Sequence, residues 1–286
     1  MRADLHVHSS ASDGTDPPAE VMRRAARAGL DVVALTDHDT VAGHRDARRA
    51  AGPVTLLPGM ELSCRVDGSR GVPGGSSPRS QQSVHMLAYL FDPDQPELAA
   101  ELERIRDDRV LRAQAMVRRL AELGVPVTWG QVAAIAGQAV VGRPHIARAM
   151  AASGAIASPR EAFTPDWIAD GGRAYVGRYA LDPVRAIGLV RAGGGVAVLA
   201  HPRADRDTRV SDEQIAGLAA AGLAGVEVFH PDQIDTERTG LLALAHDLGL
   251  VATGGSDDHG SLTGHRIGVE STDAGAYQAL MERAPG

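Results

Sequence analysis

The sequence predicts an α/β fold in which strands and helices alternate, and three observations support this. Short apolar runs recur along the chain, and most precede a stretch with the apolar spacing of a helix. Residues that begin or end helices mark several boundaries. Residue types that bind metals stand where the apolar runs end. The pattern is typical of either a parallel barrel or an open, doubly wound sheet.

The first ninety residues contain four expected strands. A strand over residues 5–7 leads to a helix that begins at Pro17-Pro18 and ends before Gly29. The next elements are a strand over 31–35, a helix over 41–51 and a strand over 54–57. Gly, Pro and Ser are abundant in residues 67–80, which predicts a mobile loop before a strand over 84–90.

Helical patterns then replace the alternation. An amphipathic helix is expected over 97–123, and Thr128-Trp129-Gly130-Gln131 has the form of a capping box that opens another. Two more helices are expected over 143–152 and 165–169. We therefore predict a barrel made by residues 1–93 and 180–286, with a helical insertion, residues 94–179, that covers the site.

The alternation resumes after residue 179. Helices are expected from Asp182-Pro183 to Gly193, over 212–221 and over 234–248, and strands over 196–199, 225–229 and 250–253. These strands run into His201-Pro202, His230-Pro231 and Asp257-Asp258-His259. No Gly-x-Gly-x-x-Gly turn follows the first strand and no Gly-Lys-Ser/Thr motif is present, so a nucleotide-cofactor fold has no support.

Composition limits the partners and the compartment. A formal charge of −7 argues against a duplex nucleic acid partner, although a local basic cleft could hold one phosphorylated ligand. The single cysteine, Cys64, excludes an internal disulfide, and we expect it to pack in the core. No apolar run approaches the roughly 20 residues that span a bilayer, and the N-terminus has no signal-peptide core. We expect a cytoplasmic protein without a membrane partner; no oligomeric state is indicated.

Histidines and carboxylates recur at the expected strand ends. They are His6, His8, His38, Glu61, His201, His230, Asp257 and His259. Each cluster alone has an ordinary alternative, such as a half-exposed strand histidine or an aspartate that caps a helix. Their recurrence favours one shared site. Mixed imidazole and carboxylate ligands suit Mn, Fe or Zn, and so many ligands predict two or three ions. Such clusters commonly hydrolyse phosphoesters.

These motifs resemble those of the polymerase and histidinol phosphatase (PHP) family. The likeness rests on His6-x-His8-Ser9 with Asp13, Thr36-Asp37-His38, Gly59-x-Glu61, His85, His201-Pro202 and Gly255-Ser256-Asp257-x-His259, in family order. It implies a distorted (β/α)7, TIM-like barrel with three divalent ions, manganese being favoured. The implied ligand sets are His6, His8, Glu61 and Asp257; Glu61, His85 and His201; and Asp13, His38 and His259. Only the likeness places His85, because a parallel strand over 84–90 would carry it to the opposite end of the barrel.

Two further motifs resemble one branch of that family. The motifs are Gly142-Arg143-Pro144-His145, and Val226-Glu227-Val228 before His230-Pro231. They look like motifs of the branch that contains nucleoside 3′,5′-bisphosphate phosphatases and 5′-to-3′ exonucleases that act on short RNA. The likeness implies hydrolysis of adenosine 3′,5′-bisphosphate to AMP. We expect the metal cluster to supply the attacking hydroxide by lowering the pKa of a bridging water. The likeness also implies that Arg143, His145 and Arg178 contact substrate and that His230 lies beside the metals. We expect Asp37 to orient His38. We expect residues 69–82 to form a longer loop than the family's usual turn.

Three alternatives remain open. A histidinol-phosphate phosphatase would use the same metals with a different pocket. A nuclease or polymerase-associated editing module would need stacking aromatics, and these are only 3% of the chain. A structural metal-binding module is the non-enzyme alternative. Outside the motifs, His44 and His246 are expected on helix surfaces and His265 in a loop.

Overall fold

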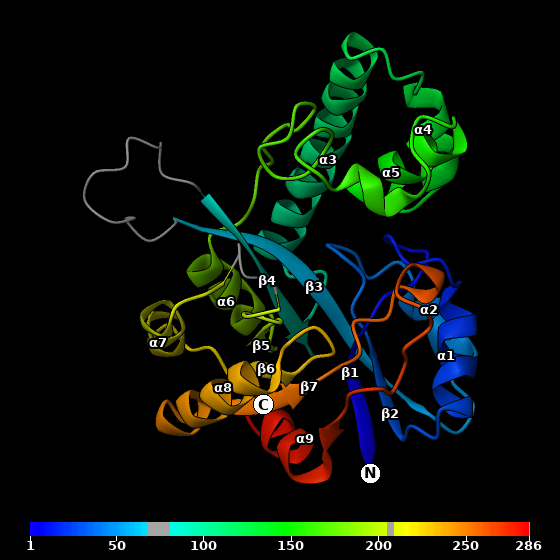
Figure 1. Cartoon of the computed structure of the whole chain (residues 1–286). Helices are drawn as coiled ribbons and strands as arrows, with labels where there is room; N and C mark the ends of the chain where they lie inside the picture. Colours follow the sequence, from blue (N-terminus) through cyan, green and yellow to red (C-terminus); the bar gives the residue numbers. More distant parts are fainter. Residues whose placement is uncertain (68–80, 205–208, 286) are drawn as a thin grey trace, which may run out of the picture.

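The fold is a nearly closed barrel of mixed strands, flanked by helices, with a helical extension to one side (Figure 1). The computed structural model describes residues 1–67, 81–204 and 209–285, so nearly all of the loop predicted over 67–80 lies outside it. Within these ranges the strands follow the order β7-β6-β5-β4-β3-β2-β1-β8. Their bounds are β1 Arg2–Val7, β2 Val32–Leu35, β3 Thr55–Asp67, β4 Gln81–Tyr89, β5 Val196–Leu199, β6 Gly225–Phe229, β7 Val251–Gly254 and β8 Thr272–Asp273.

The direction of β4 corrects the all-parallel expectation. Neighbours within β1–β2–β3 and within β5–β6–β7 are parallel, whereas β4 runs antiparallel to both β3 and β5. The start of β4 therefore lies at the edge where the parallel strands end. His85, near that start, pairs with Ser63 of β3. The antiparallel direction of β4 therefore places His85 at the same end of the barrel as the other candidate ligands. It also accounts for the distortion of the barrel.

The two ends of the sheet meet through β1, β7 and β8. Thr272 of β8 binds both backbone groups of Gly254 in β7: its hydroxyl accepts from N–H at 2.7 Å and donates to C=O at 2.9 Å. Beyond β7, the Asp257 N–H donates to His6 C=O at 2.7 Å, and the His8 N–H donates to Asp258 C=O at 2.9 Å. These bonds bring the first and last ligand motifs together.

Helices cover the outside of the barrel and form the extension. Their bounds are α1 Pro18–Arg27, α2 His44–Arg49, α3 Pro96–Glu122, α4 Trp129–Ala136, α5 Arg143–Ala152, α6 Pro183–Ala192, α7 Asp212–Ala220, α8 Asp235–Asp247 and α9 Ala274–Met281, with 3-10 turns at Pro159–Ala162 and Gly260–Leu262. The capping box at Thr128 is confirmed. The helix expected over 165–169 is wrong, because those residues form turns. No helix in the described ranges is both long and apolar enough to cross a membrane.

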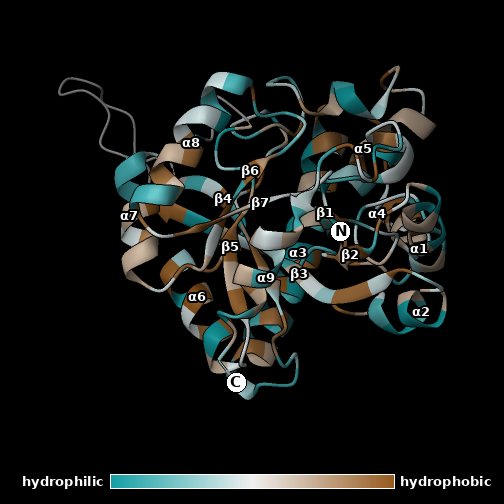
Figure 2. Cartoon of the chain, turned by 90° about the horizontal axis from the view of Figure 1, so that it is seen from below, coloured by the Kyte–Doolittle hydropathy of each residue, from teal (hydrophilic) through white to brown (hydrophobic). Residues whose placement is uncertain are grey.

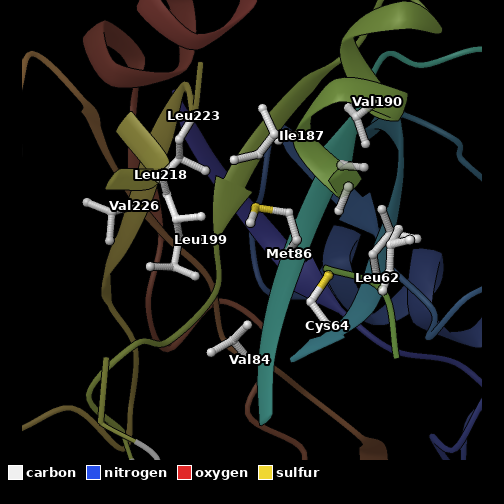
Figure 3. Close-up of a cluster of buried hydrophobic side chains, with 14 of the residues drawn as sticks. Leu62, Cys64, Val84, Met86, Ile187, Val190, Leu199, Leu218, Leu223 and Val226 are labelled. Carbon is white, nitrogen blue, oxygen red and sulfur yellow. The ribbon is translucent and has the colours of Figure 1, made fainter. Parts of the chain in front are cut away.

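Apolar side chains form separate clusters in the two parts. Leu62, Cys64 and Met86 from β3 and β4 pack against Ile187 and Val190 of α6 (Figure 3). Cys64 is fully buried, which raises the pKa of its thiol and confirms the packing role. The strands at the centre of the barrel are largely apolar, whereas α2 is largely polar on the outside (Figure 2). A second cluster lies wholly within residues 113–176, so the predicted insertion has an apolar core of its own.

Candidate metal centre

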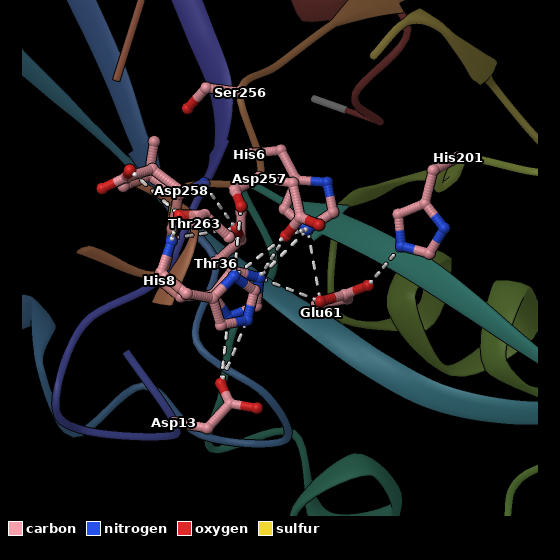
Figure 4. A network of polar contacts seen from close by, with 12 residues as sticks. His6, His8, Asp13, Thr36, Glu61, His201, Ser256, Asp257, Asp258 and Thr263 are labelled. Carbon is pink, nitrogen blue, oxygen red and sulfur yellow. Dashed lines mark hydrogen bonds and ion pairs between the residues drawn. The ribbon is translucent and has the colours of Figure 1, made fainter. Parts of the chain in front are cut away.

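The centre is built around two histidines of β1. Alternate residues of a strand face the same side, so His6 and His8 point together, with their Nε2 atoms 3.1 Å apart. Both rings are fully buried. One oxygen of Glu61 lies 3.2 Å from His6 Nε2 and 3.0 Å from His8 Nε2, and one of Asp257 lies 3.4 and 3.3 Å away (Figure 4). These four ligand atoms lie within 4.8 Å of one another.

A second group forms around Asp13. His259 Nε2 lies 3.3 Å from Asp13 Oδ1, and His38 Nε2 lies 3.8 Å from Asp13 Oδ2. The His259 ring stacks on His8 at 4.0 Å between centroids, which brings His8 Nδ1 to 3.7 Å from Asp13. His8 therefore lies with Asp13, His38 and His259, the three ligands that the family resemblance assigned to one ion. Because its ring also faces Glu61 and Asp257, His8 belongs to both groups.

The third group shares Glu61. Glu61 Oε1 lies 2.8 Å from His85 Nδ1 and 3.2 Å from His201 Nε2, while Oε2 lies 3.2 Å from His38 Nδ1. The segment after β2 pairs with β3 between His38 and Glu61, which explains how a loop residue reaches the carboxylate. The nine sequence-predicted ligands thus converge on one cluster, in which the buried Glu61 carboxylate contacts five imidazoles.

The donor atoms fit divalent cations. Within the described ranges His8 Nδ1, His38 Nδ1, His85 Nδ1 and Asp257 Oδ1 are buried without a hydrogen-bond partner. The Nδ1 atoms of His38 and His85 are near Glu61, but not in the direction of a hydrogen bond. Leaving buried polar atoms unpaired is costly, and coordination would satisfy their lone pairs. A set of imidazoles with carboxylates suits Mn, Fe or Zn.

In the absence of ions, the pKa values of neighbouring histidines shift in opposite directions. Burial alone would lower the pKa of His8, but Asp257 and Glu61 outweigh it and raise the pKa to about 10. Burial lowers the pKa of His38 to about 3 despite the attraction of Glu61 and Asp13. The metal-free centre is therefore an ion-paired network in which only some rings carry a proton.

A buried acid orients two of the ligands, a role that the sequence analysis did not assign to it although it lies in the Val226-Glu227-Val228 motif. The Glu227 carboxylate accepts the Nδ1–H of His6 at 3.1 Å and the backbone N–H of His201 at 2.9 Å. Burial would raise the pKa of Glu227, but His6 holds it below its usual range. The signal was present, because Glu227 interrupts the apolar strand β6. Because His6 donates the hydrogen bond to Glu227 from Nδ1, the lone pair of its Nε2 atom can bind a cation.

Two aspartates hold the loops that carry ligands. Asp37 accepts from the N–H and the hydroxyl of Ser9 at 2.8 and 2.7 Å and from the Ser12 hydroxyl at 2.7 Å. Asp37 therefore fixes the loop that carries Asp13, which corrects the expectation that it orients His38. Asp4 accepts from the N–H groups of Ser256 and Gly268 at 2.9 and 2.8 Å, and burial raises its pKa to about 6.

A cavity of about 810 Å³ opens onto the centre. Five of the nine ligands line it: Asp13, His38, His85, His201 and Asp257. Four arginines line it as well: Arg109, Arg112, Arg143 and Arg178. Arg109 pairs with Asp39, and Arg143 pairs with Asp170 at 2.6 Å. Among the described residues, Arg112 and Arg178 have no carboxylate within 4.0 Å.

The two arginines without a carboxylate are held by neutral oxygens. Arg112 Nε donates to Val176 C=O at 2.7 Å, and Arg178 donates to the Ser83 hydroxyl at 2.6 Å. Burial, together with nearby arginines, lowers the pKa of both to about 10, so both stay cationic at neutral pH. A cavity with partly buried arginines that have no carboxylate partner on one side, and metal ligands on another, suits a phosphorylated molecule.

Comparison with known proteins decides the family. The sequence model of the PHP domain matches residues 4–126. A 5′-3′ exoribonuclease of Haemophilus influenzae is 32% identical over 259 residues, covering 90% of this chain and 89% of that protein. The chain belongs to the PHP family of phosphoesterases.

Two further PHP relatives extend the comparison. A 3′,5′-nucleoside bisphosphate phosphatase of Chromobacterium violaceum is 34% identical over 269 residues, covering 92% of this chain and 89% of that protein. A solved structure from Bifidobacterium adolescentis has a TM-score of 0.86 at 33% identity, covering 99% of this chain and 96% of that one. The PHP match agrees with the distorted barrel and with the clustered ligands.

The remaining candidate residues have mixed outcomes in this PHP chain. Arg143 and Arg178 line the cavity, but His145 is 2% exposed and lies outside its described lining. His145 Nδ1 accepts the Gly142 N–H at 3.0 Å, so the ring caps α5 instead. His230 lines the cavity beside Asp257.

Three histidines outside the PHP centre were expected to have ordinary roles. His44 differs from its expected surface position: it is half-buried, and its Nε2 donates to Gly59 C=O at 2.8 Å. His246 is exposed as expected, and His265 lies in a half-exposed loop near Asp16.

Proposed function

We propose that this PHP chain hydrolyses a phosphate monoester of a nucleotide, and that its substrate is a nucleoside 3′,5′-bisphosphate. One observation supports this most strongly: a single cavity contains both the metal-ligand cluster and the cationic side chains of Arg112 and Arg178. A bisphosphate carries two anionic groups, one for each side of such a cavity. The C. violaceum relative carries the corresponding name.

The proposed ligand sets follow the family likeness. They are His6, His8, Glu61 and Asp257; Glu61, His85 and His201; and Asp13, His38 and His259. The His8 ring joins the last set as well, because its Nδ1 atom lies 3.7 Å from Asp13 and close to the other ligand atoms of that set. We favour manganese and three ions. Divalent ions held there would supply Lewis acidity and an activated water.

The protein's own groups prepare the site for in-line hydrolysis. Glu227 fixes the tautomer of His6, as described above. His230 Nδ1 accepts the Asp232 N–H at 3.1 Å, so its proton is on Nε2, 3.3 Å from Asp257. If a phosphoryl or leaving oxygen replaces Asp257 as the acceptor, this Nε2–H can donate a hydrogen bond to that oxygen. Each arginine fork can give two hydrogen bonds to one phosphate.

The 5′ end of an RNA is the second candidate, because the H. influenzae relative is named a 5′-3′ exoribonuclease. The formal charge of −7 gives no broad electrostatic attraction for a long strand, so we favour the small substrate. A histidinol-phosphate phosphatase would use the same metals but has less need of several arginines.

The test is metal analysis of protein purified without chelator, followed by phosphate release from four substrates. They are adenosine 3′,5′-bisphosphate, AMP, histidinol phosphate and a 5′-phosphorylated oligonucleotide. We expect the bisphosphate to have the highest kcat/KM. A higher value for histidinol phosphate, or no phosphate release by metal-replete protein, would reject the proposal.

A further inference from the structure

One wall of the cavity is apolar and contains an exposed aromatic ring. Phe163 is 43% exposed and lines the same cavity as the metal ligands. Pro144, Pro165 and Ala169 line it too. An exposed phenyl ring in a cavity otherwise rich in charged groups leaves apolar surface in water unless a ligand covers it.

The ring stands on an ordered turn. The Phe163 N–H donates to Arg160 C=O at 3.1 Å, and the Ile168 N–H donates to Ala162 C=O at 3.0 Å. Ala162 and Ile168 are fully buried, so the turn is anchored in the core of the insertion. Phe163 is therefore held at the cavity wall before any ligand arrives.

A fixed arginine lies over the same ring. The Arg143 guanidinium carbon is 5.8 Å from the Phe163 centroid, and Arg143 is itself held by Asp170 at 2.6 Å and by Ile168 C=O at 3.3 Å. This arrangement fixes the ring from one side. The part of the ring that faces the cavity can then receive a flat, aromatic group of the bound molecule.

We infer that Phe163 is the stacking platform for the nucleobase of the substrate. The inference rests on the proposed function, and it specifies that the substrate is a nucleotide with its base, not a sugar phosphate. A cavity of about 810 Å³ is large enough for both parts of a nucleotide. A base against Phe163 would cover the apolar wall while the phosphates face the arginines and the metal centre.

The test compares two substrates that share their phosphates and differ in the base: adenosine 3′,5′-bisphosphate and ribose 3,5-bisphosphate. For Phe163→Ala we expect KM for the nucleotide to rise about tenfold with kcat within about twofold, because stacking aids binding and not the chemical step. The ribose compound should be unaffected. Phe163→Trp should restore the nucleotide KM, and Leu111→Ala, an exposed residue of the same insertion, is the matched control.

The inference is overturned if Phe163→Ala leaves the ratio of kcat/KM between the two substrates unchanged. Calorimetric binding of AMP and of ribose 5-phosphate to the manganese-loaded protein gives a second readout. If wild-type protein releases phosphate from neither substrate, the proposed activity fails. In that case weaker AMP binding by Phe163→Ala, with unchanged ribose 5-phosphate binding, still supports the platform, and equal AMP binding rejects it.

Discussion

A single carboxylate, Glu61, contacts five imidazoles of the centre. The distances run from 2.8 to 3.2 Å, and the side chain is 1% exposed. Burial would raise the pKa of Glu61, yet the surrounding histidines hold it well below its usual range. Glu61 therefore stays ionised at neutral pH, where it can join two cations.

Replacing Glu61 by Gln removes that charge with little change of shape. We expect bound metal to be lost and kcat/KM to fall by more than about 100-fold, since even partners of ligands cost 10–100-fold. Metal content and phosphate release measure this, with the exposed Glu103→Gln as the matched control. Near-normal rates in a Glu61→Gln protein with full metal content would disprove the role.

The raised pKa of His8 makes metal binding pH-dependent. In metal-free protein His8 has a pKa of about 10 and is protonated at pH 7, so binding a cation must displace a proton. We expect net proton release on manganese addition and weaker binding as pH falls. Calorimetry in buffers of different ionisation enthalpy counts the protons.

The same shift contributes to the pH dependence of the stability of the metal-free state. A folded pKa above the unfolded value near 6.5 contributes stability that is present below about pH 6.5 and lost as pH rises through about 10. Metal-free protein should thus lose part of its free energy of unfolding between pH 7 and pH 10. Manganese binding without proton release, in the calorimetry described above, would contradict this account of His8.

Most elements follow from local sequence, but the direction of β4 does not. Apolar patterning predicts a strand without its direction. The sequence between β3 and β4 predicts a loop and not a helix, and a short connection permits an antiparallel pair, whereas parallel neighbours usually need a helical crossover. β8 has two residues, too few for a pattern. The start of α2 differs from the helix expected over 41–51, because residues 42 and 43 form a turn and the helix begins only at His44.

At the scale of elements, β6 supports the centre through Glu227. We expect Glu227→Ala to weaken manganese affinity roughly 10- to 100-fold, because His6 loses its partner and its fixed tautomer. Glu227→Gln keeps an acceptor for the His6 Nδ1–H and should cost less. Manganese titration measures the affinity of each variant, and circular dichroism shows whether the variant is still folded. Equal, unchanged affinities in both variants would show that Glu227 has no positioning role.

For the whole molecule, the predicted insertion and the barrel line one cavity. Eight of the nine proposed ligands stand in short motifs of the sequence, whereas only the family likeness indicated His85. Arg109 and Arg112 could not be predicted, because charged residues on a long amphipathic helix normally face water, and only the tertiary fold turns this side of α3 inward. Arg109 contacts Asp39 and Ser63, which fastens α3 to the barrel.

This arrangement makes Arg112 a substrate-binding residue in our account. Arg112→Ala should raise KM for the bisphosphate roughly 10- to 100-fold, the cost of a lost charged hydrogen bond, with a smaller effect on kcat. Arg106, exposed on the same helix, supplies the control Arg106→Ala. Steady-state kinetics measure both. If the two variants behaved alike, Arg112 would have no part in binding.

The central claim is that motifs spread from residue 6 to residue 259 coordinate cations together. A manganese-soaked crystal, measured for anomalous scattering, tests this most directly. The account predicts strong peaks within coordination distance of Glu61 and its surrounding imidazoles. The absence of an anomalous peak near Glu61, whether or not peaks are found elsewhere, would contradict it.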